Sequence, residues 1–411
     1  MAKTALPASA PGARLAEPPP TGPDDRPHGP RRIAEPGQAE LCVLLTPRET
    51  GGHEGALLGW LADAVRLHGL QLRIAATTPA LEDACAAAGL GDAQWPGLPR
   101  ADHRAGVLQV LRCWPADRPL LLAPGVLHAQ AWLLAAAVAL GHEVWVYVPM
   151  AYSARHMGYR HAALRDSLLA PWLRHVRLWI TVDGQQCRWL HRHWGLPAPV
   201  QVLPNLPRLA PQPAPACRPA TDHRLRVAWV GRFDLWQKGL DWLSGLLRAD
   251  AHWQQHFRWH FQGRGPGEAA LQGLASALGP QHALVHPHAP IHQALACNDV
   301  LLVPSRYEGM PLVALEATAL GWPVVASRQA GLATLLPPSA LFDFGDAHGL
   351  HKALTSMHTP AARAQAVAHA QDRLARQHTP QQYRPALASL VHHLRRGRHG
   401  NTPPRRQAGP C

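Results

Sequence analysis

The sequence predicts two α/β domains, each built on a doubly wound parallel sheet. Two series of apolar strand segments alternate with helical segments, one starting at Leu41 and the other at Leu225. A stretch rich in proline and almost free of apolar periodicity, residues 204–223, separates the two series. With 411 residues, the chain is long enough for each domain to bury its own core. The expected division is a first domain at 40–206, a linker at 207–223 and a second domain at 224–376.

The first domain opens with a strand, a glycine turn and a helix. Gly51-Gly52 follows the first apolar strand, and a helix is expected from about His53 to His68. The strands expected in this domain are Leu41–Leu45, Leu72–Ala75, Leu120–Ala123, Val144–Val148, Leu178–Val182 and Val200–Leu203. Helical segments between them complete the alternating pattern.

The two ends of the chain differ from the domains in composition. Residues 1–39 are dense in proline, alanine and arginine and contain no apolar block, which predicts disorder and excludes the apolar core of a secretory signal. Residues 397–411 form a basic tail that we also expect to be disordered. Before this tail, Tyr383–Leu394 is expected to form a last helix within residues 377–396.

Cysteine usage and hydropathy favour a cytoplasmic protein. The seven cysteines are an odd number, lie far apart and form no Cys-x-x-Cys pair, so they indicate neither a disulfide framework nor a zinc knuckle. The longest apolar run, Ala129–Leu140, is too short to span a bilayer.

The formal net charge of +13 is concentrated partly in residues 155–192. Apolar residues recur there at helical spacing, so one face is apolar and the other basic; they are Leu164, Leu168, Leu169, Trp172, Leu173 and Val176. One interpretation is an ordinary amphipathic helix that buries its apolar face. Another is a surface that meets anionic lipid headgroups or an acidic acceptor. Nucleic acid is a third, but no recognition module accompanies the charge.

Residues 301–327 carry the most specific pattern in the chain. An apolar strand is followed by Pro304-Ser305, a turn opens at Glu308-Gly309, and Pro311 is expected as the first residue of a short helix that carries Glu316. A helix N-terminus after a glycine turn offers backbone N–H groups to an anion. The two carboxylates beside it suit hydroxyl groups, so this pattern predicts a site for a sugar attached to a diphosphate.

A second cluster lies upstream, after the strand Arg226–Gly231. Arg232 and Lys238 leave the loop at the carboxyl end of this strand, where ligands bind in open α/β sheets. Two cations there could neutralise a leaving diphosphate. By itself this cluster is better explained as solvated loop charges.

Together the two clusters resemble the retaining glycosyltransferases of family 4. The resemblance rests on Gly231-Arg232, Lys238-Gly239 and the interval from Glu308 to Glu316, which matches the E-x7-E motif of that family. Weaker matches occur in the same order at Gly51-Gly52, Pro204-Asn205, Gly263-Arg264-Gly265-Pro266 and Asn298-Asp299. The resemblance covers residues 40–396 and is strongest from 224 to 330. It departs at Arg264, where relatives usually have Asp, so the contact with the nucleotide base is not predicted.

The resemblance implies a GT-B fold, in which two Rossmann-like domains face each other across a cleft and the last helix packs back on the first domain. It implies transfer of a sugar from a nucleotide-diphosphate sugar to a glycan or lipid-linked acceptor with retained anomeric configuration. The expected pathway is the synthesis of cell-envelope polysaccharide or glycolipid, and the expected location is the cytoplasm, with peripheral attachment at the inner face of the membrane. An anionic membrane surface is a further expected partner, and nucleic acid is not. The alternatives are an epimerase or phosphorylase of the same fold, or a non-catalytic binding protein that uses its basic surface.

The resemblance also implies roles for single residues. The expected catalytic residues are Arg232, Lys238, Glu308 and His156. The residues expected to hold the donor are Gly51, Gly52, Gly231, Arg232, Lys238, Gly263, Gly309, Met310, Pro311, Leu312, Val313 and Glu316. His156 follows a strand where relatives often place an active-site histidine, although it could be a bystander in a chain with 27 histidines. The sequence contains no Asp-x-Asp motif, so we expect neither a metal ion nor another cofactor.

Overall fold

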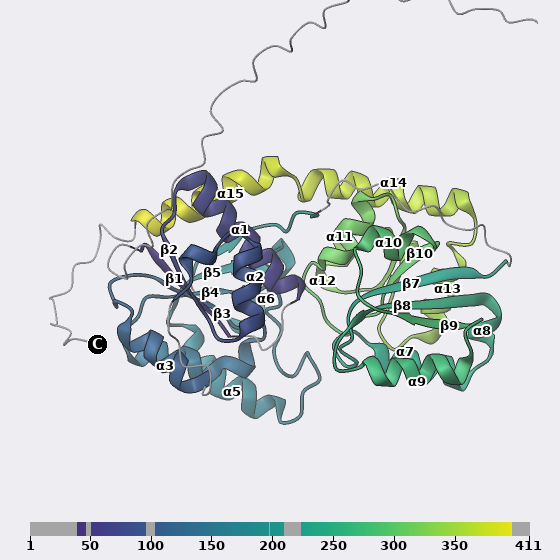
Figure 1. Cartoon of the computed structure of the whole chain (residues 1–411), viewed down its shortest axis with the longest axis horizontal. Coiled ribbons are helices and arrows are strands. Elements are labelled where there is room, and N and C mark those ends of the chain that lie inside the picture. Colours follow the sequence, from purple (N-terminus) through teal and green to yellow (C-terminus); the bar gives the residue numbers. More distant parts are fainter. Residues whose placement is uncertain (1–38, 47–50, 96–102, 197, 209–222, 397–411) are drawn as a thin grey trace, which may run out of the picture. The chain divides into compact units, whose positions relative to one another are not determined.

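The computed structural model describes residues 39–46, 51–95, 103–196, 198–208 and 223–396. Within these residues the chain forms two six-stranded sheets whose strand pairs are all parallel (Figure 1). This arrangement confirms the predicted fold class. The expected disordered tails lie outside the described residues apart from Ala39, and the linker does so apart from Pro207, Arg208 and His223.

The first half of the described chain, residues 39–208, contains the sheet ordered β2-β1-β3-β4-β5-β6. Its strands are β1 (Leu41–Leu45), β2 (Leu72–Ala76), β3 (Leu120–Ala123), β4 (Val144–Tyr147), β5 (Val176–Thr181) and β6 (Val200–Val202). Its helices are α1 (Gly52–His68), α2 (Pro79–Ala87), α3 (His103–Cys113), α4 (Ala131–Ala139), α5 (Ala162–Leu173) and α6 (Gly184–Trp194), with short 3-10 turns η1 (Gly91–Ala93) and η2 (Leu127–Gln130).

The second half, residues 223–377, contains the sheet ordered β12-β11-β10-β7-β8-β9. Its strands are β7 (Leu225–Arg232), β8 (Phe257–Arg264), β9 (Ala283–His286), β10 (Val300–Val303), β11 (Val324–Ser327) and β12 (Leu341–Phe342). Its helices are α7 (Leu240–Ala249), α8 (His252–His256), α9 (Glu268–Leu278), α10 (Ile291–Ala296), α11 (Leu312–Ala319), α12 (Ala330–Leu335), α13 (Ala347–Thr355) and α14 (Pro360–Gln377), with the 3-10 turn η3 (Pro338–Ala340).

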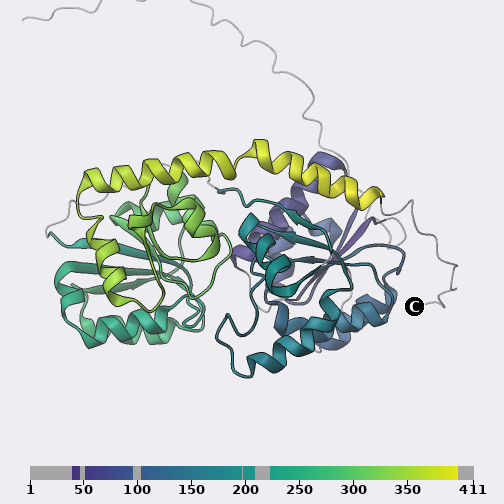
Figure 2. The same cartoon turned by 180° about the vertical axis from the view of Figure 1, so that it is seen from behind.

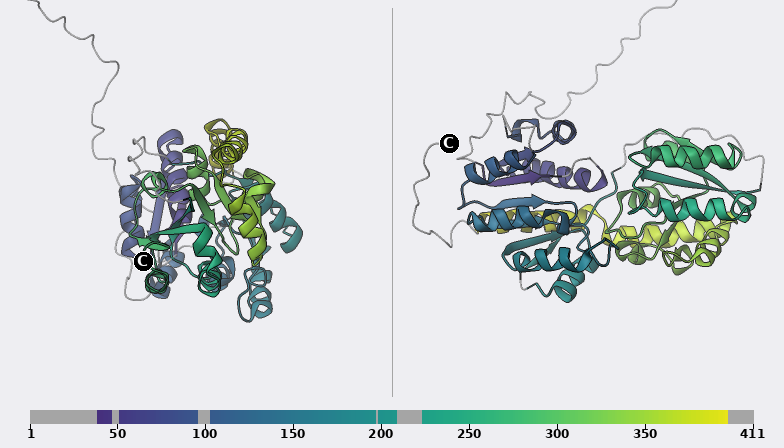
Figure 3. Two further views of the ribbon diagram at one scale, coloured as in Figure 1. Left: turned by 90° about the vertical axis from the view of Figure 1, so that its right-hand side faces the viewer. Right: turned by 90° about the horizontal axis from the view of Figure 1, so that it is seen from below.

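Helices cover both faces of each sheet (Figure 3), and the central strands are accordingly apolar throughout. Every residue of β1 and of β10 is buried. Each sheet has a point where the strand order reverses, between β1 and β3 in the first half and between β10 and β7 in the second. Loops leaving the strands at such a point are the usual place for a ligand. Gly51, Lys238 and Glu308 lie on these loops, and Gly52 is the first residue of α1.

The last two helices run one after the other at the end of the described chain (Figure 2). Helix α14 packs on α11 and α12 of the second half, whereas α15 (Pro380–Arg396) packs on α1 of the first. The Tyr383 hydroxyl donates to Asp63 of α1 at 2.8 Å, and Gln201 of β6 donates to the Ala386 carbonyl oxygen at 2.9 Å. The last described helix therefore packs against the first half.

Three details correct the expectations from sequence. Pro311 is the N-cap residue of α11 with an extended backbone, so the helix begins one residue later than expected. Val176 begins β5 instead of extending a helix. Helix α14 was not anticipated, because it buries only Ala366 and Ala370 and so has no stripe of large apolar residues to reveal it.

Helix α5 divides the apolar residues of the basic stretch between two environments. Leu169 and Leu173 are buried, whereas Leu164 and Leu168 are 60% and 59% exposed. An ordinary amphipathic helix therefore accounts for only part of the pattern. None of the helices in the described part of the chain combines the length and the apolar character needed to cross a bilayer.

Candidate functional site

The loops that follow β7 and β10 lie next to each other because these two strands pair in the sheet. Gly239 shows how tightly the loops pack, since a Cβ atom there would lie 2.1 Å from the Pro304 carbonyl oxygen. Gly239 also has a φ of +67°, a conformation that favours glycine. The close contact brings Lys238 of one loop to Glu308 of the other.

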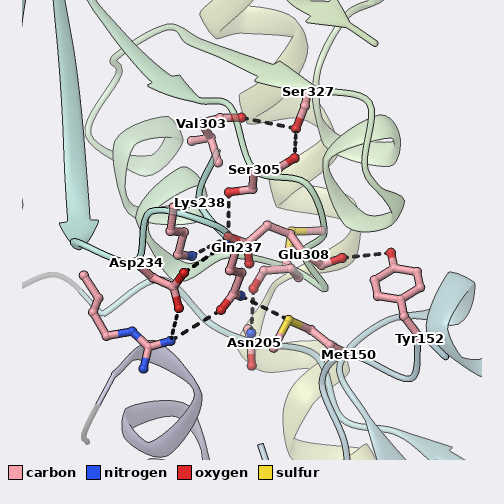
Figure 4. A network of polar contacts seen from close by, with 12 residues as sticks. Met150, Tyr152, Asn205, Asp234, Gln237, Lys238, Val303, Ser305, Glu308 and Ser327 are labelled. Atoms are coloured by element: carbon pink, nitrogen blue, oxygen red, sulfur yellow. Dashed lines mark hydrogen bonds and ion pairs between the residues drawn. The ribbon is translucent and has the colours of Figure 1, made fainter. Parts of the chain in front are cut away.

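Lys238 and Glu308 form an ion pair through Nζ and Oε1. The same carboxylate oxygen accepts a hydrogen bond from Ser305 Oγ at 2.9 Å (Figure 4). Ser305 is held in turn by Ser327, whose hydroxyl donates to the Ser305 carbonyl oxygen at 2.5 Å. Glu308 is buried and Lys238 is partly buried. The structure thus brings together two of the residues predicted to be catalytic.

Arg232 lies at the end of β7, in the same loop region as Lys238. Its Nη2 donates to Gln237 Oε1 at 3.4 Å and lies 3.6 Å from the Asp234 carboxylate. Gln237 also donates from Nε2 to the sulfur atom of Met150 in the first half, at 3.4 Å. Arg232 is therefore held near the boundary between the halves, with its positive charge opposed by Asp234.

The backbone from Gly309 to Leu312 forms the turn into α11. A Cβ atom at Gly309 would lie 2.1 Å from the Pro149 carbonyl oxygen, so only glycine permits this approach of the first half. The Met310 carbonyl oxygen accepts from Asn205 Nδ2 at 2.9 Å. Leu312 and Val313 are half-buried in the first turn of α11.

Two further glycines predicted to hold the donor lie side by side in the sheet. Gly231 of β7 and Gly263 of β8 are register partners.

Glu316 lies on the same face of α11 as Leu312, one turn further along. Burial raises the pKa of its carboxyl group to about 7. The positive charge of Arg208 and a backbone hydrogen bond from that residue act in the opposite direction. The carboxyl group is thus a hydrogen-bonding group whose charge changes near neutral pH.

The first half contributes side chains that the sequence did not single out. Tyr152 donates its hydroxyl to the Glu308 carbonyl oxygen at 2.9 Å, and the hydroxyls of Tyr159 and Tyr307 are 3.2 Å apart. In the opposite direction, Trp236 of the second half donates from Nε1 to the carbonyl oxygen of Met157 in the first half at 3.1 Å. No local sequence pattern predicts these contacts, because each joins residues far apart in the chain.

Gly51 and Gly52 are exposed at the start of α1, where Gly51 donates its N–H to Glu54 Oε2 at 2.8 Å. His53 follows them and was not predicted as a site residue. Its side chain is 11% exposed and stacks on Tyr147 with ring centroids 5.1 Å apart. Burial lowers its pKa, and the charge of Arg232 lowers it further against the opposing effect of Glu54. His53 is therefore a neutral imidazole within electrostatic reach of Arg232.

His156 lies in an aromatic cluster of the first half. Its ring stacks on Tyr152 and meets the edge of Trp189, each with a centroid separation of 4.6 Å, and its backbone N–H donates to Ser153 Oγ at 3.2 Å. Burial of the ring lowers its pKa. Its described contacts lie with this cluster, and Tyr152 stands between it and Glu308.

The sequence of the second half matches a known family model. Residues 224–368 match the model described as glycosyl transferases group 1. The match includes the region where the resemblance predicted from the sequence is strongest. A curated relative, the sulfoquinovosyl transferase of Arabidopsis thaliana, is 32% identical over 111 residues, which are 27% of this chain and 21% of the relative. The chain therefore matches about a fifth of the length of this relative.

Solved structures of the GT-B class resemble the chain over most of its length. HepE from Anabaena, solved with UDP-glucose, has a TM-score of 0.67 at 15% identity and covers 86% of this chain and 99% of its own. Sucrose-phosphate synthase from Thermosynechococcus elongatus has a TM-score of 0.61 at 18% identity and covers 87% and 98%. These similarities establish the GT-B fold that the resemblance implied.

Proposed function

We propose that the protein is a retaining glycosyltransferase that transfers a sugar from a nucleotide-diphosphate sugar to a glycan or lipid-linked acceptor, in the synthesis of cell-envelope polysaccharide or glycolipid. The observation that carries this proposal is the pairing of Lys238 with Glu308 beside the start of α11, within the part of the chain that matches the family. A bound donor would separate this pair. Lys238 would then face the diphosphate and Glu308 the hydroxyls of the sugar.

Arg232 and Lys238 supply the positive charge that a leaving diphosphate requires, so we propose that the reaction needs no metal ion. The N–H groups at the start of α11 offer further hydrogen bonds to the phosphates. Glu316 would accept from the ribose. UDP is the first nucleotide to try, because HepE was solved with UDP and with UDP-glucose.

The test is thermal unfolding of the protein with UDP, GDP, ADP and their sugars, without metal and with Lys238→Ala for comparison. A ligand at a hundred times its Kd stabilises the folded state by about 2.7 kcal/mol. We expect stabilisation by one nucleotide, and its loss in Lys238→Ala. Absence of any shift in the wild type would refute the donor site and favour a non-catalytic binding protein. Release of free sugar or sugar phosphate without an acceptor would instead indicate an epimerase or phosphorylase.

We further propose that α5 attaches the enzyme to an anionic membrane surface. Leu164 and Leu168 lie one turn apart and are exposed, and Arg160, Arg165 and Arg174 beside them are exposed as well. The carboxylate of Asp166 is engaged by the N–H groups of Ala154 and Arg155 at 2.7 and 3.2 Å. Two apolar side chains surrounded by arginines suit the interface of anionic lipids.

Sedimentation with vesicles tests this surface. The wild type should bind phosphatidylglycerol vesicles and not phosphatidylcholine vesicles, and replacement of both Leu164 and Leu168 by serine should abolish binding. Leu67→Ser is the matched control, because this leucine of α1 is 42% exposed. Equal binding of the double variant would exclude α5 as the attachment site.

A further inference from the structure

The segment Pro204–Arg208 joins elements of both halves. Arg208 donates from Nη1 to the Gly55 carbonyl oxygen at 2.5 Å and from Nη2 to the Ala56 carbonyl oxygen at 3.3 Å, so its guanidinium group lies against helix α1. In the same segment, Asn205 donates to the Met310 carbonyl oxygen ahead of α11. The segment therefore connects α1 with the start of α11.

Gly59 makes room for this guanidinium group. A Cβ atom at position 59 would lie 1.2 Å from Arg208 Nη2 and 2.1 Å from Arg208 Cζ. Glycine inside a helix costs about 1 kcal/mol relative to alanine. The space that Gly59 leaves for the guanidinium group of Arg208 thus explains why a glycine occurs in the middle of α1.

Arg208 also acts on Glu316. Its peptide N–H forms a hydrogen bond with the Glu316 carboxylate, and its positive charge favours the ionised form of that group. Arg208 and Leu312 line one cavity of about 180 Å³, and Glu316 follows Leu312 by one turn of α11. The carboxylate that lines this cavity belongs to Asp63, and it accepts a hydrogen bond from the hydroxyl of Tyr383 at 2.8 Å.

We propose that Arg208 is a positioning residue that orients the Glu316 carboxylate for the ribose of the donor nucleotide. Because the guanidinium group of Arg208 packs against Gly59, the position of this carboxylate depends on helix α1. The inference rests on the proposed function, because it takes Glu316 as the ribose ligand. It adds that the first half and the linker determine how well the second half distinguishes a ribose from a sugar without hydroxyls.

The experiment compares the affinities of UDP and 2′,3′-dideoxy-UDP by calorimetry. The wild type should prefer UDP by about tenfold or more, as expected for a hydrogen bond to a charged group. In Gly59→Ala and in Arg208→Ala the preference should fall to roughly threefold or less, since only part of the hydrogen bond remains, while dideoxy-UDP binds as before. Gly245→Ala is the control, because this glycine also lies inside a helix but has open space around it.

A pH profile provides a readout that loss of structure alone would not change. The preference for UDP should decline as Glu316 is protonated, near its pKa of about 7, and the midpoint should move to higher pH in Arg208→Ala. Arg208→Lys should shift the pH midpoint less than Arg208→Ala does, because lysine keeps the positive charge. It should still lose the contacts with the Gly55 and Ala56 carbonyl oxygens, which require the planar guanidinium group.

The outcomes separate the two proposals. If the wild type binds UDP and the folded variants keep both its preference and its pH midpoint, the role of Arg208 is refuted while the donor site stands. If the wild type binds none of the nucleotides, both proposals fail. Should Gly59→Ala prove unstable, Arg208→Ala decides alone, since it introduces no clash.

Discussion

The second half contributes most of the charged groups of the candidate site, whereas the first half contributes hydroxyls, glycines, backbone atoms and, at its end, Arg208. Arg232, Lys238 and Glu308 all come from the loops after β7 and β10. From the first half, Tyr152 supplies a hydroxyl and Pro149 a carbonyl oxygen that packs on Gly309. Charged groups in a partly buried site act more strongly on a developing charge than hydroxyls do. Substitutions in the second half should therefore have the larger effects on turnover.

The largest effect is expected when the central ion pair is removed. Lys238→Ala and Glu308→Gln should each lower kcat by about two to three orders of magnitude, as loss of one preorganised charge contact does. Turnover of the donor identified by thermal unfolding is the measurement. Lys352→Ala serves as the control, because Lys352 is exposed on α13. Near-normal turnover in either variant would mean that the Lys238–Glu308 pair has no role in catalysis. The expectation that substitutions in the second half have the larger effects on turnover would then be wrong.

A smaller effect is expected for Glu316, and it concerns the stability of the folded protein without ligand. Its folded-state pKa of about 7 exceeds the ordinary value of 4.5, so the folded state binds the proton more tightly than the unfolded state does. Stability should therefore fall as the pH rises from about 4.5 to 7. Glu316→Gln removes this loss and should stabilise the protein at pH 8 by roughly 1 to 3 kcal/mol, with little effect at pH 4.5.

Chemical unfolding at several pH values measures this effect. Glu308→Gln is a useful comparison, because Glu308 is paired with Lys238 and its replacement should destabilise the protein at the same pH. If Glu316→Gln leaves the pH dependence unchanged, the carboxyl group is not strained by burial. Stabilisation by Glu316→Gln together with destabilisation by Glu308→Gln would show that the two carboxylates of the motif contribute to stability in opposite directions.

Much of the second half could be predicted from its sequence because its chemistry lies in short segments. The strand, turn and helix from Val300 to Ala319 place Glu308 and Glu316 by local geometry alone, and the pairing of β7 with β10 follows from the doubly wound order. The resemblance to family 4 added the roles of these residues. Those roles remain predictions, while the GT-B fold is confirmed and the second half matches the model of glycosyl transferases group 1.

The contacts of the first half could not be predicted in the same way. Tyr152 reaches Glu308 across 156 positions of sequence, and Arg208 reaches Gly59 through packing that no local pattern encodes. His53 differs, because its place directly after Gly51-Gly52 was visible in the sequence. Helix α14 was missed for another reason, namely that alanines rather than large apolar residues form its buried face.

The smallest expected effect concerns the hydroxyl group through which the first half holds the Glu308 turn. Tyr152→Phe removes the donor to the Glu308 carbonyl oxygen and keeps the ring stacked on His156. A hydrogen bond of this kind contributes about 1 kcal/mol, so kcat/KM should fall by roughly fivefold. Tyr159→Phe is the comparison, because its hydroxyl also meets the second half but contacts Tyr307 instead of Glu308. Equal losses in the two variants would mean that both hydroxyls merely hold the halves together. A loss confined to Tyr152→Phe would show that the first half acts on the turn that presents Glu308.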